Sequence, residues 1–138
     1  DDALACEREI RAGRYRGPLH GIPISVKDLI DVAGVQTTSG SAQPAGEPTA
    51  DAPAVARLRD AGAIIIGKTN LSEWANFRDN DSISGWSGRG GQTRNPYILD
   101  RNPCGSSSGS GAAIAANLAA IAIGTETDGS ILCPSTIN

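Results

Sequence analysis

The sequence is short of several residue types, and each shortage narrows the function classes open to the chain. It contains no methionine, one histidine (His20) and two lysines (Lys27 and Lys68). Aromatic residues make up 4% of it, too few for a platform that stacks the bases of a single strand. The net charge is −3 with no basic block, which does not predict nucleic-acid binding. No apolar run reaches the ~18 residues of a membrane-spanning helix, so we expect neither a nucleic-acid nor a membrane partner.

The missing methionine has a second consequence. Translation begins with methionine, so this chain is expected to be processed or to be a piece of a longer one. We expect the native N-terminus to be missing, and the absence of a secretory leader is therefore uninformative. The compartment stays open between cytoplasm and periplasm, and the oligomeric state stays open as well.

Cysteine and histidine are too few and too scattered to predict a metal site. The cysteines are Cys6, Cys104 and Cys133, an odd number without a C-x-x-C pair, and His20 is the sole histidine. Metal centres built from these residue types need several ligands at short, regular spacings. We therefore expect the cysteines to be ordinary thiols.

What the sequence does contain is typical of a compact, turn-rich domain. It has 138 residues, 39% of them hydrophobic, and 17 glycines, enough for one modest core. Helix and strand patterns alternate, which predicts an α/β fold with a layered sheet flanked by helices. We expect long loops over 32–48 and 77–103. The expected helices are Ala3–Ala12, a helix from Asp51 as N-cap to Ala61, Asn70–Asn76 and Ser110–Asn117, and the expected strands are Ile24–Val26, Ala63–Ile66 and Ala119–Gly124.

The stretch from Cys104 to Pro134 joins two hydroxyl-rich turns through an apolar, alanine-rich segment. If the expected strand Ala119–Gly124 runs antiparallel to the expected helix Ser110–Asn117, the start of the helix lies close to the end of the strand. The turn with Ser106 and the turn with Ser130 are then expected at the same edge of the fold.

Two motif matches in the sequence are misleading. The segment Gly62–Thr69 fits the phosphate-loop pattern G-x-x-x-x-G-K-T, but its middle is an Ile-Ile-Ile run. Such a run predicts a strand, whereas a phosphate loop needs a flexible turn after a strand. The segment Gly105–Gly109 fits G-x-S-x-G, yet no strand precedes it and His20 lies upstream rather than downstream. His20 sits in a Pro/Gly turn, where a solvated or structural imidazole is the usual outcome.

A serine nucleophile without histidine needs another base, and a buried lysine can serve as one. Burial lowers the pKa of an amine and populates its neutral form. Lys27 directly follows the expected strand Ile24–Val26, and ligand sites in α/β sheets lie at the carboxyl ends of strands. An exposed lysine, or one paired with Asp28, is the alternative interpretation.

Five spaced segments resemble the amidase signature family of serine amidohydrolases, from about Gly17 to the end of the chain. In order they are GIPISVKD (21–28), AGAIIIGKTN (61–70), GQTRNP (91–96), CGSSSGS (104–110) and GTETDGSI (124–131). The resemblance implies an amidase-signature-type α/β fold, of which residues 1–138 form a partial domain that lacks the C-terminal remainder.

The resemblance also implies a Ser–Ser–Lys triad and no metal or cofactor. In it Ser130 is the nucleophile, Ser106 the bridging serine after a cis peptide bond, and Lys27 the base. Ser107 has a supporting role. The backbone of Thr127, Asp128, Gly129 and Ser130 would form the oxyanion hole.

Four positions depart from the common family pattern. Cys104, Ser108 and Asp128 stand where glycine is usual, and Leu132 stands where arginine is frequent. The segment GWSGRGGQTRNP (85–96), combined with Cys104, Asp128 and Cys133, looks most like the peptide amidase branch, which removes C-terminal amides from peptides. The expected substrate is thus a peptide amide or a small carboxamide. The alternatives are a catalytically incompetent fragment and a transamidase or amidotransferase A-type subunit, while a nucleotide-binding module is disfavoured.

Overall fold

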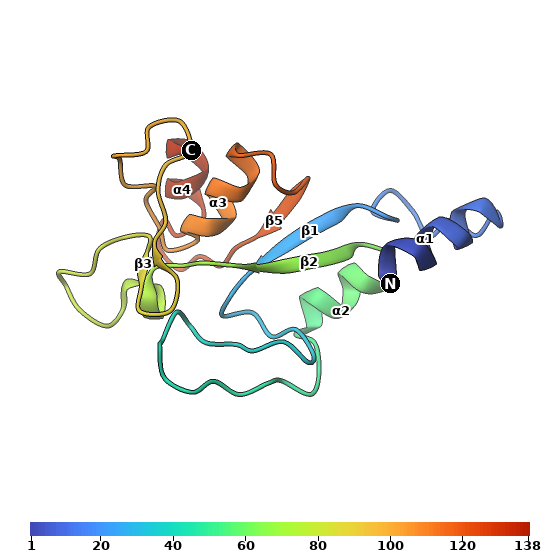
Figure 1. Cartoon of the computed structure of the whole chain (residues 1–138), viewed down its shortest axis with the longest axis horizontal. Coiled ribbons are helices and arrows are strands. Elements are labelled where there is room, and N and C mark those ends of the chain that lie inside the picture. Colours follow the sequence, from blue (N-terminus) through green and yellow to red (C-terminus); the bar gives the residue numbers. More distant parts are fainter.

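A three-stranded parallel sheet, in the order β2–β1–β5, forms the centre of the computed structural model, which describes residues 1–138. The central strand β1 (Pro23–Lys27) pairs with β2 (Ile64–Thr69) on one side and β5 (Ile121–Ile123) on the other. Because the strands are parallel, their carboxyl ends share one edge (Figure 1). At this edge Lys27 is paired with Thr69. The predicted α/β class is confirmed.

Helices cover both faces of this sheet. α2 (Pro53–Asp60) lies on one side, and α3 (Ser108–Ala115) and α4 (Leu132–Ile137) lie on the other, while α1 (Asp2–Arg11) lies at the far end of the strands (Figure 1). The small core on the α2 side contains Val26, Val32 and Val55. Since side chains alternate along a strand, Val26 facing α2 directs Lys27 to the opposite face, toward α3.

The expected helix at Asn70–Asn76 is wrong. The segment forms only the short turn η1 (Glu73–Asn76), in which Trp74 and Ala75 have left-handed φ values of 51° and 57°. Neighbouring loops take the backbone donors that an α-helix would use internally. The N–H of Ser72 donates to the Ser106 carbonyl at 3.0 Å, and the N–H of Trp74 donates to a loop carbonyl at 2.9 Å.

Other boundaries differ because of local contacts. Asp51 is not the N-cap of α2, since Ala52 holds that place. The Asp51 carboxylate instead accepts hydrogen bonds from the Ala33 N–H at 2.8 Å and Arg59 Nε at 2.9 Å. The hairpin of β3 (Trp86–Ser87) and β4 (Gly91–Gln92) and the helix α4 were not predicted.

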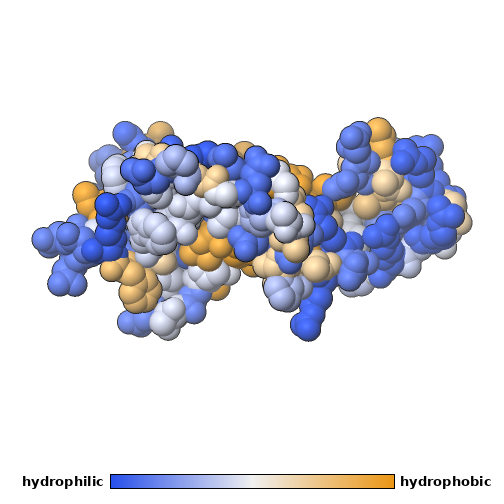
Figure 2. Space-filling model, turned by 90° about the horizontal axis from the view of Figure 1, so that it is seen from below, coloured by the Kyte–Doolittle hydropathy of each residue, from blue (hydrophilic) through white to orange (hydrophobic).

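Apolar side chains are widely exposed on this chain. Figure 2 shows orange apolar residues among blue hydrophilic ones across one face of the molecule. Only 26 of the 138 residues are buried, and Phe77, Tyr97 and Leu118 are each at least 70% exposed. None of the helices has both the length and the apolar character needed to cross a bilayer.

Candidate active site

Lys27 is fully buried at the carboxyl end of β1 and has only hydroxyl and carbonyl partners. Its Nζ donates to Ser106 Oγ at 2.7 Å, to Thr125 Oγ1 at 2.9 Å and to the Thr125 carbonyl at 3.3 Å. The neighbouring Asp28 carboxylate turns away and accepts from the N–H and the hydroxyl of Thr38. The alternative of an exposed or Asp28-paired lysine is therefore wrong.

The surroundings of Lys27 favour the neutral amine. Burial lowers the pKa of Lys27 from its ordinary value to about 8. No carboxylate lies close enough to Nζ to form an ion pair and restore the charge. With a pKa of about 8, the neutral amine is a minor species near neutral pH and becomes the major one above pH 8, so this lysine can act as a proton acceptor without a large energetic penalty.

The turn before α3 presents Ser106 to this amine. Ser106 is fully buried, and the peptide bond between Gly105 and Ser106 is cis, as the family resemblance implied. A Cβ at Gly105 would collide with Ser72 Oγ, so only glycine fits there. Ser108, which stands where the family commonly has glycine, donates from Oγ to the Cys104 carbonyl at 2.6 Å and fastens the turn to the helix.

The turn with Ser130 meets the turn with Ser106, as the sequence predicts. The N–H of Ser107 donates to the Ser130 carbonyl at 2.9 Å. Ser130 itself is half-buried, and its hydroxyl makes no hydrogen bond within the chain, so the observed link between the turns is a backbone one. The structure thus joins the Ser106 hydroxyl directly to the Lys27 amine, whereas no hydrogen bond joins the hydroxyls of Ser130 and Ser106.

Thr125 connects the lysine to the serine turns, and sequence reasoning missed it. Besides accepting two hydrogen bonds from Lys27, Thr125 accepts from Ser107 Oγ at 3.1 Å through its carbonyl and donates to the same Oγ at 3.2 Å through its N–H. Its position directly after the predicted strand Ala119–Gly124 indicates the edge of the sheet, but it does not indicate Lys27 as the partner.

Glu126 organises the turn that carries Ser130, and it was also missed. Its carboxylate accepts from the backbone N–H groups of Gly129 at 2.9 Å, Ile131 at 2.8 Å and Leu132 at 2.9 Å. The bonds from Leu132 and Ile131 chiefly hold the pKa of Glu126 below its ordinary value. An acidic residue just before a helix start is a recognisable sequence signal, but α4 itself was not predicted.

The four predicted oxyanion donors are not equivalent. The N–H of Gly129 is already engaged by Glu126. The N–H groups of Thr127, Asp128 and Ser130 have no acceptor within the chain. The Asp128 side chain is exposed and makes no hydrogen bond or ion pair, so nothing in the chain holds its carboxylate over these donors.

The phosphate-loop match and His20 both have structural roles. The phosphate-loop match lies largely in strand β2, and Lys68 Nζ donates to the Ile30 carbonyl at 2.7 Å, as the strand interpretation predicts. His20 is buried away from the serine turns, where Nδ1 accepts from the Arg16 N–H at 3.2 Å and Nε2 lies 3.3 Å from a Glu9 oxygen. No cluster of three or more His, Cys, Asp and Glu side chains could hold a metal ion.

The expectation that all three cysteines are ordinary thiols is wrong. Cys104 and Cys133 form a disulfide across 29 positions, with their Cα atoms 5.8 Å apart, while Cys6 is free and buried. The two cysteines lie beside the turns that carry Ser106 and Ser130, and they come together because those turns meet. The spacing of cysteines in a sequence does not predict which of them pair.

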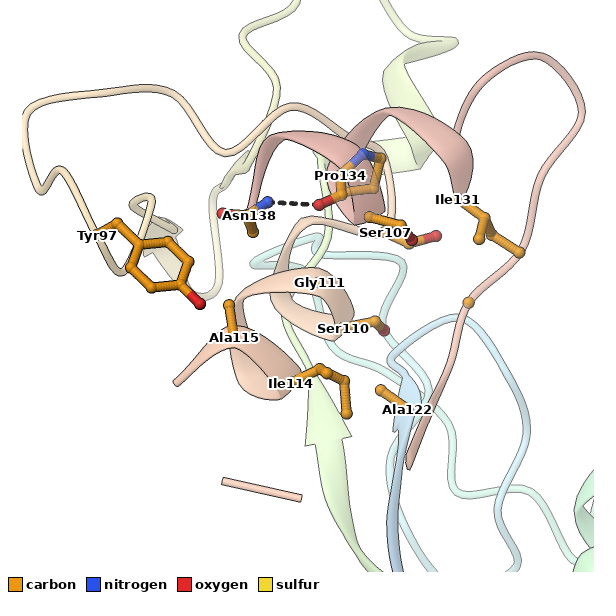
Figure 3. Close-up of a pocket in the computed structure, with 12 residues that line it drawn as sticks. Tyr97, Ser107, Ser110, Gly111, Ile114, Ala115, Ala122, Ile131, Pro134 and Asn138 are labelled. Carbon is orange, nitrogen blue, oxygen red and sulfur yellow. Dashed lines mark hydrogen bonds between the residues drawn. The ribbon is translucent and has the colours of Figure 1, made fainter. Parts of the chain in front are cut away.

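A groove of about 370 Å³ adjoins the site between α3, α4 and β5 (Figure 3). Ser107 and Ile131, the neighbours of Ser106 and Ser130, are among the residues that line it. The other lining residues combine apolar side chains, such as Ile114, Ala122 and Pro134, with polar ones, among them Ser110, Ser135 and Asn138. A groove of mixed polarity therefore lies beside the candidate site.

Comparisons with known proteins agree with this geometry. The family model described as Amidase matches residues 1–138, so the chain belongs to the amidase family. It is similar to the native peptide amidase from Stenotrophomonas maltophilia, with 65% identity and a TM-score of 0.94 over 97% of this chain. It is also 49% identical over 134 residues to a probable amidase of Arabidopsis thaliana, and 43% identical over 136 residues to a glutamyl-tRNA(Gln) amidotransferase subunit of Acidothermus cellulolyticus.

These relatives are much longer than this chain. The matches cover 28% of the Stenotrophomonas peptide amidase and 26% of the Arabidopsis protein, against 97% and 96% of the present sequence. The chain thus spans about a quarter of the length of its relatives.

Proposed function

We propose that the protein to which this chain belongs hydrolyses amide bonds, with Ser130 as nucleophile and Ser106 and Lys27 as its proton relay. The observation that carries the proposal is the contact of 2.7 Å between Lys27 Nζ and Ser106 Oγ, buried and without a carboxylate. A structural lysine is usually solvated or paired with an acid, whereas this one is buried with hydroxyl and carbonyl partners only, and burial lowers its pKa toward the range of a base.

Three contacts of Lys27 fit a neutral amine. A neutral amine has two N–H donors and one lone pair. The carbonyl and hydroxyl oxygens of Thr125 can take the two donors, at 3.3 and 2.9 Å. The lone pair then faces Ser106 Oγ, and it accepts the Ser106 proton while Ser106 accepts a proton from Ser130.

The accessible Ser130 oxygen then attacks the carbonyl carbon of the amide. Negative charge develops on the carbonyl oxygen, and free backbone N–H groups at the nucleophile can stabilise it. Thr127, Asp128 and Ser130 offer such groups, while Glu126 holds the Gly129 N–H and thereby shapes the turn.

The rest of the cycle uses the same groups. The relay returns the proton to the leaving nitrogen, the C–N bond breaks, and the acyl group stays on Ser130 as an ester. A water molecule gives up its proton to the relay and hydrolyses that ester, which restores Ser130. No step in this cycle requires a metal or cofactor.

The proposed substrate is a peptide with a C-terminal amide, or another carboxamide. Support comes from the relative named peptide amidase at 65% identity, compared with 43% for the amidotransferase subunit. The amidotransferase alternative differs in using glutamine as amide donor. The two substrates therefore distinguish the two functions.

We also propose that residues 1–138 are a partial domain that does not turn over substrate by itself. Support comes from the exposed apolar side chains on α4 and β5, among them Leu132 at 65% exposure and Ile121 at 36%. An uncovered sheet edge and such side chains favour aggregation over a well-ordered site. Robust ammonia release by the isolated fragment would contradict this.

The test is ammonia release by the full-length protein from a C-terminally amidated peptide and, separately, from glutamine. The proposal predicts release from the peptide amide, a covalent adduct of Ser130 with a fluorophosphonate, and loss of both in Ser130→Ala. Release from glutamine alone would favour the amidotransferase. Neither release nor adduct would refute the serine hydrolase.

A further inference from the structure

The disulfide brackets both serines of the candidate triad. Cys104 lies two residues before Ser106, and Cys133 lies three residues after Ser130. The bond therefore joins the two turns outside the reacting groups, without touching Lys27. Neither the proposed proton relay nor the oxyanion donors use it.

The other contacts that hold these two segments are non-covalent, and they include two hydrogen bonds between Ser107 and Thr125 and one from Asn95 Nδ2 to the Ile137 carbonyl at 3.0 Å. One backbone hydrogen bond connects Ser107 to Ser130, and Asn138 Nδ2 donates to the Pro103 carbonyl at 2.8 Å from the end of α4. α4 has only six residues, and Pro134 is its one buried side chain. A helix this short does not hold itself together in water, so the position of the Ser130 turn depends on its tethers.

The Cys104 end of the disulfide is a fixed point. The N–H of Cys104 donates to Asn102 Oδ1 at 2.8 Å, and its carbonyl accepts from Ser108 Oγ at 2.6 Å. Ser108 is the first residue of α3 and is fully buried. The disulfide thus adds a covalent link between the short α4 and the turn that also carries Ser106.

We propose that the Cys104–Cys133 disulfide is a positioning element that holds Ser130 in register with Ser106, so that the oxidised protein is the active form. This inference rests on the proposed function. A dithiol reductant opens the bond: two electrons and two protons convert the S–S bond into two thiols, and the reductant becomes a cyclic disulfide. The Ser130 turn then loses its covalent tether while Lys27, Ser106 and Thr125 keep their contacts.

The experiment compares the full-length protein before and after dithiothreitol. Thiol alkylation followed by mass analysis reports the state of Cys104 and Cys133, and circular dichroism reports the fold. Opening the bond is expected to lower kcat for the peptide amide, and the rate of fluorophosphonate addition to Ser130, by about tenfold to a hundredfold, as a displacement near 1 Å does. KM and the circular dichroism spectrum should stay unchanged, and reoxidation should restore the rates.

Variants make the test independent of the reductant. The double variant Cys104→Ala/Cys133→Ala should have the low rates of the reduced protein and no response to dithiothreitol. The control Cys6→Ala removes the free thiol on α1 and should behave as the unmodified protein in both states. If the double variant does not fold, reduction of the unmodified protein still decides.

Several results would overturn the inference. One is alkylation of Cys104 and Cys133 without reductant, which would show that the bond does not form. Another is reduction that leaves kcat and Ser130 labelling unchanged, and a third is loss of activity together with the circular dichroism signal. If the oxidised protein neither releases ammonia nor reacts at Ser130, the proposed function itself fails, and the inference fails with it.

Discussion

Lys27 Nζ and Ser106 Oγ lie 2.7 Å apart although 79 positions separate them in the sequence. The sheet creates this contact, because β1 delivers the lysine to the edge where the turn before α3 begins. Both side chains are fully buried, so the contact is shielded from water. The function proposed for this amidase-family chain depends on it.

Replacing Lys27 with methionine keeps the length of the side chain and removes the proton acceptor. In the full-length protein, Lys27→Met should lower kcat by about 10²- to 10⁴-fold, the usual contribution of a general base. Lys68→Met is the matched control, because Lys68 is also partly buried at a strand end but binds loop carbonyls. The Lys68→Met variant should have a lower thermal unfolding midpoint than the unmodified protein and the same pH dependence of kcat. Equal losses of kcat in both variants would contradict the role given to Lys27.

The lowered pKa of Lys27 also predicts how stability changes with pH. The folded pKa is about 8, and an unfolded lysine titrates near ~10.4. Between these values the unfolded state binds more protons, so the free energy of unfolding should rise with pH. Urea titrations of the full-length protein at pH 7 to 10 should show this rise, and Lys27→Met should remove its share. An unchanged slope in the variant would contradict a buried, neutralised amine.

Thr125→Val removes one acceptor of the Lys27 ammonium and keeps the shape of the side chain. A hydrogen bond to the charged form favours that form, so its loss should lower the pKa of Lys27 further. The midpoint of the pH–rate profile should therefore move to lower pH, with a fall in kcat of about tenfold. Thr49→Val, at an exposed position without hydrogen bonds, should change neither quantity. A midpoint that stays in place, or rises, would remove Thr125 from the relay.

Glu126→Gln keeps the size of the side chain but replaces the charged carboxylate, which accepts hydrogen bonds from three backbone N–H groups, with a neutral amide. Fluorophosphonate addition to Ser130 should slow by about tenfold, because charged acceptors make the stronger bonds. Since the folded pKa of Glu126 is lowered, its stabilising effect is present above the ordinary carboxyl pKa and is lost as pH falls through the lowered value. The labelling rate of Ser130 in the unmodified protein should therefore fall at acid pH as Glu126 becomes protonated. Glu126→Gln should lack this part of the pH dependence. Glu47→Gln, at an exposed glutamate, should match the unmodified protein.

Gly111→Ala tests how closely α3 and α4 must pack. A Cβ at Gly111 would lie 2.8 Å from the Pro134 carbonyl oxygen. Overpacking of this kind costs about 1–3 kcal/mol, so the thermal midpoint should fall and Ser130 labelling should slow as α4 is displaced. Gly46→Ala meets no atom within 4 Å and should be neutral in both measurements. A fully reactive, stable Gly111→Ala would show that α4 has room to move without affecting the site.

The contacts that sequence could predict are those fixed by position on an element. Lys27 follows a strand, and the carboxyl ends of parallel strands converge, so its place at the site edge followed from the pattern. The meeting of the Ser106 and Ser130 turns followed from a helix and a strand of short length between them. The catalytic roles expected for Lys27, Ser106 and Ser130 came from the family resemblance, because the spacing of these residues in the sequence does not indicate a role.

What sequence did not predict depends on distant partners. Thr125 contacts Lys27 across 98 positions, and a threonine after a strand has no visible partner in a linear pattern. The disulfide of Cys104 and Cys133 belongs to the same class, because connectivity is set by the fold. The left-handed turn at Trp74 arises because surrounding loops take its backbone donors, against the helical preference of the local sequence.

The most direct test of the central claim is the pH dependence of fluorophosphonate addition to Ser130 in the full-length protein. If a neutral Lys27 draws the proton through Ser106, the rate should rise with pH to a midpoint at about 8 and then level off. Lys27→Met should abolish this rise and leave a slow, nearly flat profile. A midpoint near 8 that persists in Lys27→Met, or no midpoint in the unmodified protein, would contradict the relay.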